Sequence, residues 1–421
     1  MDFLKTWPKR YTLVSLCFCA AFICYIDRVN ISVAAIPMKE AFGWSETVKG
    51  LVLSSFFVGY LAMQVPGGWL AHRIGGKFVL GFAVIWWSIF TILTPPAAFT
   101  SLAALIVVRI ALGLGEAVTF PAGFVLLGKW VPPTERSRAV VVLLSGAPLG
   151  IVTALFTTGW IVNQFGWPAS FYLFGLVGFA WAGVWYFRVF EEPAAHPRIS
   201  GGELELLHAQ KRKNAEFQKV PWKLLFSKRP IWALVINHFC VNWSAYMLIA
   251  WLPSYFRDAH GVSIIGAGFY SAAPWLTQFL MMNIAGGIAD SLLKKGLPAT
   301  VVRKIMQSIG LLGAAAFLIL AREADTAPMA MILMCGALGL LAFAYSGFAP
   351  NPLEIAPRYA GILAGITNTV ATIPGIIGVA VTGWLVDVTG SYASAFALAA
   401  GMNVFGAITW LLFATARPVV D

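Results

Sequence analysis

Apolar residues along this chain gather into long runs that shorter polar segments separate. Twelve runs are each long enough to cross a bilayer as a helix, which takes roughly 20 residues. Six precede a polar segment at 188–229: Tyr11–Met38, Val48–Leu70, Phe78–Ala97, Ser101–Leu127, Ala139–Asn163 and Ser170–Phe187. Six follow it: Ile231–Phe256, Ala267–Leu292, Ile305–Ala321, Pro328–Ala349, Gly361–Val386 and Tyr392–Ala414. Because a helix satisfies its own backbone hydrogen bonds, this pattern predicts an all-α membrane protein with twelve transmembrane helices.

The connections between the runs suggest how the chain is divided. Pro95-Pro96 predicts a tight turn between the third and fourth runs. The segment 188–229 is the one long polar stretch, and it carries the basic triplet Lys211-Arg212-Lys213. We therefore expect an N-terminal six-helix bundle over 1–189, a cytoplasmic linker over 190–229 and a C-terminal six-helix bundle over 230–421.

The two halves share sequence. Thr158-Gly-Trp-Ile-Val162 in the fifth run recurs as Thr382-Gly-Trp-Leu-Val386 in the eleventh, and Gly166 matches Gly390 at the same offset. Equivalent runs keep the same orientation, so the repeat is parallel. In transporters, such halves are related by a pseudo-two-fold axis along the membrane normal, with the substrate site between them.

Composition and charge agree with a membrane protein. The chain is 59% hydrophobic and 11% charged, whereas soluble domains carry about 25% charged residues. Its net charge of +11 follows from topology. With both termini in the cytoplasm, most of the 29 Lys and Arg residues lie on that side, as the positive-inside rule requires. The exceptions are Arg28 and Arg109 within runs, and Lys39, Lys49, Arg257 and Arg322 outside. We therefore expect no nucleic-acid partner.

The sequence lacks the residue patterns that several classes of chemistry require. The five cysteines all fall in apolar runs with no Cys-x-x-Cys pair, so neither a zinc site nor a disulfide framework is indicated. No Walker sequence is present, which excludes ATP as the energy source. We find no nucleophile–base constellation and no cleavable signal peptide. The sequence predicts neither an enzyme nor a bound cofactor.

The fourth run carries two charges that need an explanation. Arg109 and Glu116 lie two helical turns apart on one face, about 10 Å along the axis. A charge at mid-bilayer costs on the order of 3 kcal/mol on insertion scales and usually faces a polar cavity or a partner. Gly113 and Gly115 between them would let a neighbour or a ligand approach. A cation and a protonatable acid on one intramembrane face suggest a site for an anion and a proton.

A second charged pair, Asp27-Arg28, lies midway along the first run. Arginine offers a rigid fork of donors that matches a carboxylate or a phosphate. Tyr25 stands one turn before Arg28, while Tyr60 and Gln64 share a face of the second run. In the alternative reading, Asp27–Arg28 or Arg109–Glu116 is a static salt bridge between the first and fourth spans.

Several stretches resemble the major facilitator superfamily. Gly68-Trp-Leu-Ala-His72-Arg73-Ile-Gly-Gly-Lys77 matches its loop motif between spans two and three, with His72 in place of the usual Asp. The chain is most similar to the anion:cation symporter family, which includes bacterial galactonate and hexuronate transporters, sialin, vesicular glutamate transporters and plastid phosphate and ascorbate transporters. The similarity rests on Tyr25-Ile-Asp-Arg-Val-Asn30, Gly59-Tyr60-x-x-x-Gln64-Val-Pro-Gly-Gly68, Arg109-x-x-x-Gly-x-Gly-Glu116, Ile265–Trp275, Val302–Gly310 and Ile355–Gly361.

The resemblance implies a secondary transporter that moves a small organic anion, such as a sugar acid, by alternating access with proton symport. The residues expected to bind substrate are Arg28, Arg109, Tyr25, Tyr60, Gln64, Asn242, Trp243 and Asn368, and those expected to carry protons are Asp27 and Glu116. For Asn242, Asn351 and Asn368, interhelical hydrogen bonding is the alternative role. We expect a monomer in a bacterial inner membrane. A sodium-coupled phosphate transporter and an uncoupled anion exchanger are the competing interpretations.

Overall fold

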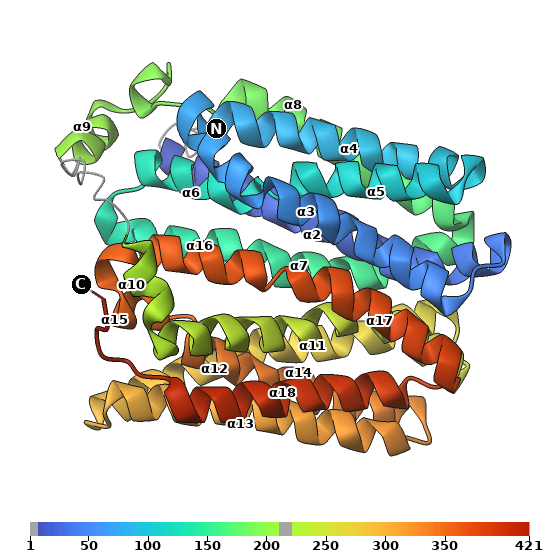
Figure 1. Ribbon diagram of the computed structural model, residues 1–421. Helices are drawn as coiled ribbons and strands as arrows, with labels where there is room; N and C mark the ends of the chain where they lie inside the picture. The colour runs from blue at the N-terminus through green and yellow to red at the C-terminus, as the bar shows by residue number, and fades with distance from the viewer. Residues whose placement is uncertain (1–6, 210–220, 421) are drawn as a thin grey trace. The chain divides into compact units, whose positions relative to one another are not determined.

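The computed structural model describes residues 7–209 and 221–420. Within these ranges all regular secondary structure is helical, and loops connect the helices. It contains twelve helical segments long and apolar enough to span a membrane, which confirms the predicted fold class (Figure 1). The first six are α2 (Lys9–Phe42), α3 (Glu46–Ile74), α4 (Gly76–Thr100), α5 with α6 (Leu102–Glu116, Thr119–Trp130), α7 (Pro133–Phe165) and α8 (Trp167–Arg188).

The second six follow the segment between the halves, which carries α9 (Gly201–Ala209) and α10 (Trp222–Ser227). They are α11 (Arg229–His260), α12 (Ile264–Lys294), α13 (Ala299–Leu320), α14 with α15 (Ala327–Phe348, Asn351–Ile355), α16 with α17 (Ala360–Val370, Ile373–Thr389) and α18 (Ala393–Phe413). The basic triplet at 211–213 lies outside the described residues.

The prediction of a turn at Pro95-Pro96 is wrong. Both prolines lie inside α4, which continues to Thr100. The chain turns instead at Ser101, whose backbone is extended (φ −170°, ψ 160°) and whose side chain caps α5 by accepting the N–H of Ala104. A proline fixes φ near −65°, a value that helices also use, so two prolines late in a helix need not end it.

The helices pack into two compact units that do not follow the chain order. Unit 1 comprises Met1–Asn30, Val58–Ala154 and Phe165–Phe217. Unit 2 comprises Ile31–Phe57, Leu155–Gln164 and Gln218–Asp421, so it includes one end of each of α2, α3 and α7. The division into bundles over 1–189 and 230–421 stays a prediction.

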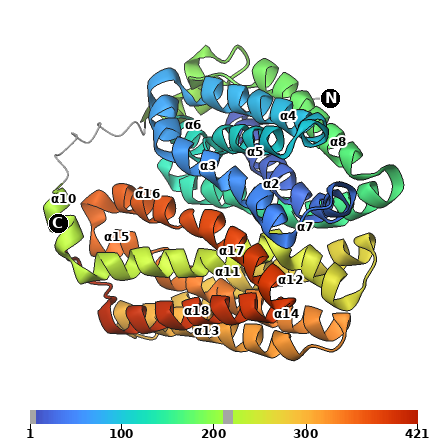
Figure 2. The same ribbon diagram turned by 45° about the vertical axis from the view of Figure 1, so that its right-hand side comes forward.

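In unit 1, α4 packs between α5 and α8 (Figure 1). Small residues allow the helices close approach: a Cβ added at Gly59 of α3 would lie 1.9 Å from the carbonyl oxygen of Ile110 on α5. In unit 2, α13 packs against α14 and α18 (Figure 2). Its apolar core includes Val302, Met306 and Phe343.

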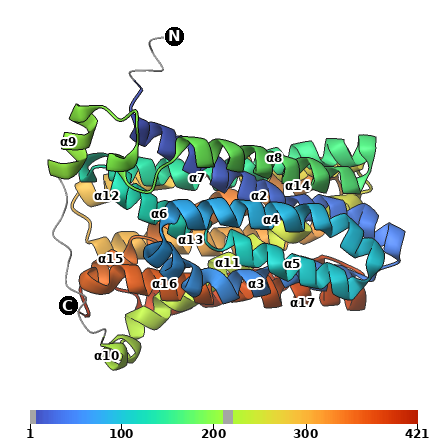
Figure 3. The same ribbon diagram turned by 90° about the horizontal axis from the view of Figure 1, so that it is seen from above.

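Two glutamates between the halves cap helices of unit 1. Helix α9, labelled in Figure 3, carries Glu203. This carboxylate accepts the backbone N–H groups of Lys9 and Arg10, each at 3.0 Å, at the start of α2. Glu191 accepts the N–H groups of Gly76 and Lys77 at the start of α4. Because the first N–H groups of a helix have no partner within it, both carboxylates fix the position of a helix end.

Candidate functional site

Four charged side chains that the sequence singled out lie buried together in unit 1. Asp27 and Arg28 come from α2, and Arg109 and Glu116 come from α5. Their exposed fractions are 1%, 6%, 1% and 1%, respectively. The helices thus bring two arginines and two acids to one place away from the surface, where the effective dielectric constant is low and charges interact strongly.

The ion pair in this cluster joins α2 to α5. Arg28 approaches Glu116 Oε2 through Nε and Nη2, each at 3.1 Å. The sequence suggested Asp27–Arg28 and Arg109–Glu116 as the pairs, whereas the structure pairs Arg28 of one span with Glu116 of the other. Successive residues of a helix point about 100° apart, so Asp27 and Arg28 face different neighbours, and Arg109 lies two turns away from Glu116. The rotation of α2 against α5 therefore decides the pairing.

Two tyrosines line the guanidinium of Arg28. Its Cζ lies 4.4 Å from the centre of the Tyr25 ring and 4.6 Å from that of Tyr60. Both rings thus present their faces to the cation. Such cation–π contacts contribute about 0.5–2 kcal/mol each and orient the guanidinium plane.

Asp27 occupies a separate position in the cluster. The charges that act on it are those of Glu116 and Arg109. Both of its carboxyl oxygens are buried, and the indole of Trp87 lies close enough to act on the carboxyl group as a donor. The two acids therefore differ: Glu116 is held by an arginine, while Asp27 faces the neutral Trp87.

The fourth span is interrupted at Glu116. Helix α5 ends at this residue and α6 begins at Thr119, whose hydroxyl donates to the Glu116 carbonyl at 2.8 Å. The eleventh span is interrupted between Val370 and Ile373. The sequence predicts a continuous helix for each of these spans. Gly115 and Pro121 in the fourth span and Pro374 in the eleventh are the residues that mark the breaks. Interrupted helices expose backbone polar groups, and transporters use them at binding sites.

The predicted polar residues of the second half lie in unit 2. Asn242 donates to the carbonyl of Ala371, at the break in the eleventh span, at 2.9 Å. Trp243 is buried against Gly378, and Asn368 is exposed on α16. Asn351 donates to the carbonyl of Thr415 at 2.8 Å. The hydrogen bonds of Asn242 and Asn351 fit the alternative structural role, and contact of Asn242, Trp243, Asn368 and Gln64 with an anion stays a prediction.

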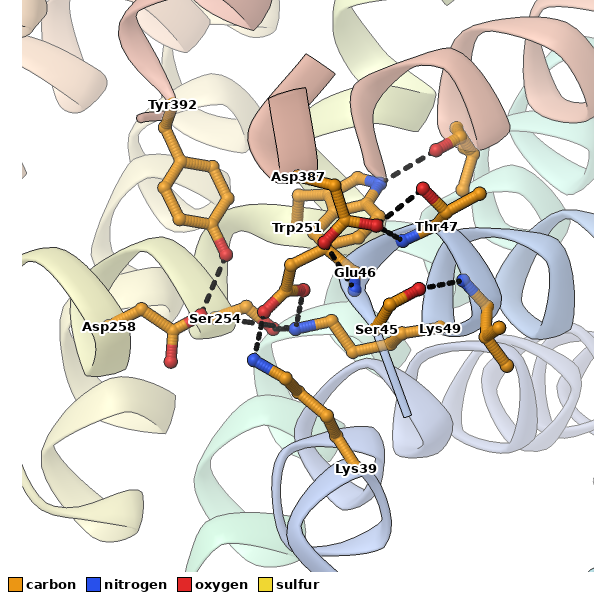
Figure 4. A network of polar contacts seen from close by, with 12 residues as sticks. Lys39, Ser45, Glu46, Thr47, Lys49, Trp251, Ser254, Asp258, Asp387 and Tyr392 are labelled. Carbon is orange, nitrogen blue, oxygen red and sulfur yellow. Dashed lines mark hydrogen bonds and ion pairs between the residues drawn. The ribbon is translucent and has the colours of Figure 1, made fainter. Parts of the chain in front are cut away.

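Sequence reasoning missed a second polar cluster, in unit 2, at the ends of the spans predicted to face away from the cytoplasm. We call it the outer network, and it comprises Lys39, Glu46, Thr47, Lys49, Ser254, Asp258, Asp387 and Tyr392 (Figure 4).

Lys49 of α3, which the sequence assigns to the side away from the cytoplasm, lies within this network and is 1% exposed. It pairs with Glu46 at 2.5 Å and donates to Ser254 of α11 at 3.1 Å.

Further contacts tie the outer network to α17 and α18. Asp387 of α17 accepts the backbone N–H groups of Glu46 and Thr47, at 2.9 and 2.6 Å, at the start of α3. Tyr392 donates to Asp258 at 2.8 Å, and burial raises the pKa of its hydroxyl well above the usual value, which keeps the donor protonated. The Glu46–Lys49 spacing of three was the one signal in the sequence.

Beside the outer network lies a pocket of about 410 Å³ in unit 2. Its lining includes Lys39, Glu46 and Asp258 from the network, together with His260, Arg322 and Phe396. Two basic residues, Lys39 and Arg322, and two acidic residues, Glu46 and Asp258, line it, so this pocket has no excess of positive charge that would select an anion.

Comparisons with known proteins agree with the motifs. A family model described as Major Facilitator Superfamily matches residues 17–379. Sodium-dependent phosphate transport protein 1, chloroplastic, of Arabidopsis thaliana is 42% identical over 417 residues, covering 99% of this chain and 81% of that protein. The ascorbate transporter, chloroplastic, of the same species is 42% identical over 417 residues, covering 99% and 77%. Sialin of Homo sapiens is 38% identical over 442 residues, covering 96% and 89%.

A solved structure has the same fold. The bacterial homologue of the human lysosomal transporter Spinster, in its inward-facing and occupied conformation, matches with a TM-score of 0.78 and 20% sequence identity, covering 97% of each chain. The fold, the family model and the relatives confirm the predicted resemblance. This integral, multi-pass membrane protein belongs to the Major Facilitator Superfamily, among the relatives that form its anion:cation symporter family.

Proposed function

We propose that this protein is a secondary transporter that carries a small organic anion, such as a sugar acid or a similar carboxylate, together with a proton. The observation that carries the proposal is the buried ion pair between Arg28 and Glu116. An arginine held by an acid can exchange that acid for another carboxylate, and an acid that releases an arginine can take up a proton. Anion binding by Arg28 and proton uptake by Glu116 are therefore coupled at this pair.

The chemistry follows from charge balance. With both acids ionised, Asp27, Arg28, Arg109 and Glu116 sum to zero. An added anion would then leave one uncompensated negative charge in a buried site, which is costly. If a proton binds with the anion, the total charge stays at zero. Symport of at least one proton with a monovalent anion is thus the loading that leaves no uncompensated negative charge in the cluster.

In the proposed cycle, Glu116 and Asp27 take up protons while the site is open to the outside. Protonation removes the charge that holds Arg28, and its guanidinium, stacked between Tyr25 and Tyr60, becomes available to the anion. On the cytoplasmic side the acids lose their protons, Glu116 pairs again with Arg28, and the anion leaves. Arg109 supplies the second positive charge of the site.

The outer network supports alternating access. It joins the end of α2 and the start of α3 to α11, α17 and α18, and Glu46, Lys49 and Ser254 within it are buried. Opening the outer ends of these helices requires these contacts to break, and water then solvates the separated charges. We propose that the outer network is the latch that holds the outer ends closed.

The test is a measurement of internal pH in proteoliposomes loaded with a pH-sensitive dye. Galactonate, glucuronate, glutamate, sialic acid, ascorbate and phosphate are added in turn without sodium. Acidification with one organic anion, absent from liposomes without protein, would support proton symport and identify the substrate class. Entry of a labelled anion with no acidification would contradict proton coupling.

A second candidate function is sodium-coupled uptake of inorganic phosphate, which the name of one relative at 42% identity favours. Phosphate that enters only when sodium is present would support it. An uncoupled exchanger would instead move labelled anion only against unlabelled anion, whatever the ion gradient. We further propose a monomer in a bacterial inner membrane. Both termini lie in the cytoplasm in this proposal, because most of the basic residues then fall on the cytoplasmic side.

A further inference from the structure

The thiol of Cys24 lies beside the carboxyl group of Glu116. Cys24 is one helical turn before Arg28 on α2 and is fully buried. Its Sγ donates to Glu116 Oε2 at 3.3 Å, the oxygen that Arg28 Nε and Nη2 also approach, each at 3.1 Å. One carboxyl oxygen therefore accepts two hydrogen bonds, one from Arg28 Nε and one from the thiol, and it forms an ion pair with Arg28 Nη2 as well.

The other oxygen of Glu116 has a different environment. Oε1 is buried, and it accepts no hydrogen bond from the residues that the structure describes. A carboxylate has about four acceptor positions, two on each oxygen. The donors of α2 thus fill one side of the group and leave the other side without donors.

We infer that Cys24 is a positioning residue for Glu116: together with Arg28 its thiol holds Oε2, so that Oε1 is the atom that takes up and releases the proton. The inference rests on the proposed function for the use made of this proton. Which oxygen of Glu116 takes up the proton depends only on the contacts around this carboxyl group.

The step is a simple proton transfer. A proton from water adds to a lone pair of Oε1, and the charge of the carboxyl group changes from −1 to 0. The neutral group holds Arg28 less strongly, because a hydrogen bond to an ionised acceptor is about twice as strong as one to a neutral acceptor. Arg28 is then released for another anion, and loss of the proton from Oε1 reverses the step.

A thiol suits this position because it is a weak donor. A donor to Oε2 stabilises the charged form of Glu116 and opposes protonation. A hydroxyl would do so more strongly, and an apolar side chain would not do so at all. The other titratable groups around Glu116 are Asp27 and Arg28 of α2, Tyr60 of α3 and Arg109 of α5. Arg28 Nη2 also donates to Cys24 Sγ at 3.8 Å, so a substitution at residue 24 acts on Glu116 directly and through this arginine.

The experiment is an infrared titration of the reconstituted protein without substrate. The C=O stretch of the protonated Glu116 carboxyl is followed between pH 4 and 10, and it is assigned by its loss in Glu116→Gln. We expect Cys24→Ala to move the midpoint of this titration upward by about 0.5–1 pH unit. Cys24→Ser, which keeps the size and strengthens the donor, should move it downward. Cys17→Ala removes a buried thiol from the same helix and should leave the midpoint unchanged.

Opposite shifts for alanine and serine would support the inference, because a loss of packing has no reason to change sign between them. Shifts in the same direction, or none beyond that of Cys17→Ala, would overturn it. If Cys24→Ala fails to fold, the sign of the Cys24→Ser shift decides. Opposite shifts in a protein that moves no protons with any anion would overturn the proposed function alone. Proton-coupled uptake with an unmoved midpoint would overturn this inference alone.

Discussion

Asp387 of α17 caps the first turn of α3 by accepting the backbone N–H of Thr47 at 2.6 Å, and the Thr47 hydroxyl donates to the same carboxylate. A carboxylate at a helix N-terminus satisfies donors that have no partner within the helix and interacts favourably with the helix dipole. This cap comes from a residue 340 positions away. The start of α3 is thereby fixed to α17 by backbone groups as well as side chains.

We expect Asp387→Ala to loosen this end of α3. The N–H groups of Glu46 and Thr47 would lose their acceptor, at a cost of about 1–2 kcal/mol. Hydrogen exchange over residues 44–50 should speed up by roughly tenfold, since 1.4 kcal/mol corresponds to that factor. Asp290→Ala, at an exposed position near the end of α12, is the matched control. Equal exchange in the two variants would contradict a latch at Asp387.

The buried lysine of the outer network gives a second prediction. Lys49→Met removes the positive charge that Glu46 and Asp258 share and leaves Glu46 with Lys39 alone. Removal of one partner of a buried ion pair costs about 3–5 kcal/mol, and simultaneous removal of the other partner restores much of this. We expect a large drop in the thermal unfolding midpoint for Lys49→Met and a partial recovery in Lys49→Met/Glu46→Gln. Additive losses would show that the two side chains are not coupled.

Twelve spans were predictable because bilayer thickness fixes the length of an apolar helix, whatever its neighbours. The positions of Arg28 and Glu116 within spans were predictable for the same reason. Their pairing was not, because it depends on how α2 is rotated against α5, and one sequence does not encode that rotation in its spacing. Lys49 illustrates the same limit. The sequence indicates only the side of the membrane on which it lies, while its burial depends on Ser254 and Asp258, about 200 residues away.

Arg28 should not be replaceable by lysine. Lysine keeps the charge but loses the planar fork that reaches Glu116 through two nitrogens and stacks against Tyr25 and Tyr60. We expect Arg28→Lys to lower anion uptake at least about tenfold, which corresponds to one lost charge-assisted hydrogen bond. Arg73→Lys is the control, because Arg73 also stacks on an aromatic ring, that of Trp69, at an exposed position. Equal uptake by the two variants would remove Arg28 from the binding site.

Glu203 should matter for stability and not for transport. It caps α2 and pairs with Arg10, outside the charged cluster. Glu203→Ala is expected to destabilise the protein by about 1–2 kcal/mol, the usual cost of a lost helix cap. Glu205→Ala, at an exposed position on the same helix, should have little effect. Thermal unfolding in detergent measures the difference, and a changed apparent affinity for the anion in Glu203→Ala would contradict a purely structural cap.

Glu116→Gln separates proton coupling from anion movement. The amide keeps the size of the side chain and cannot carry a proton, so it mimics the neutral form that releases Arg28. Anion exchange across the membrane should therefore persist, whereas accumulation against a concentration gradient driven by an inward proton gradient should be lost. Glu40→Gln, at the exposed end of α2, should retain both activities. Accumulation that survives in Glu116→Gln would mean that the proton travels with another group, and Asp27, buried in the same cluster, would then be the acid to test.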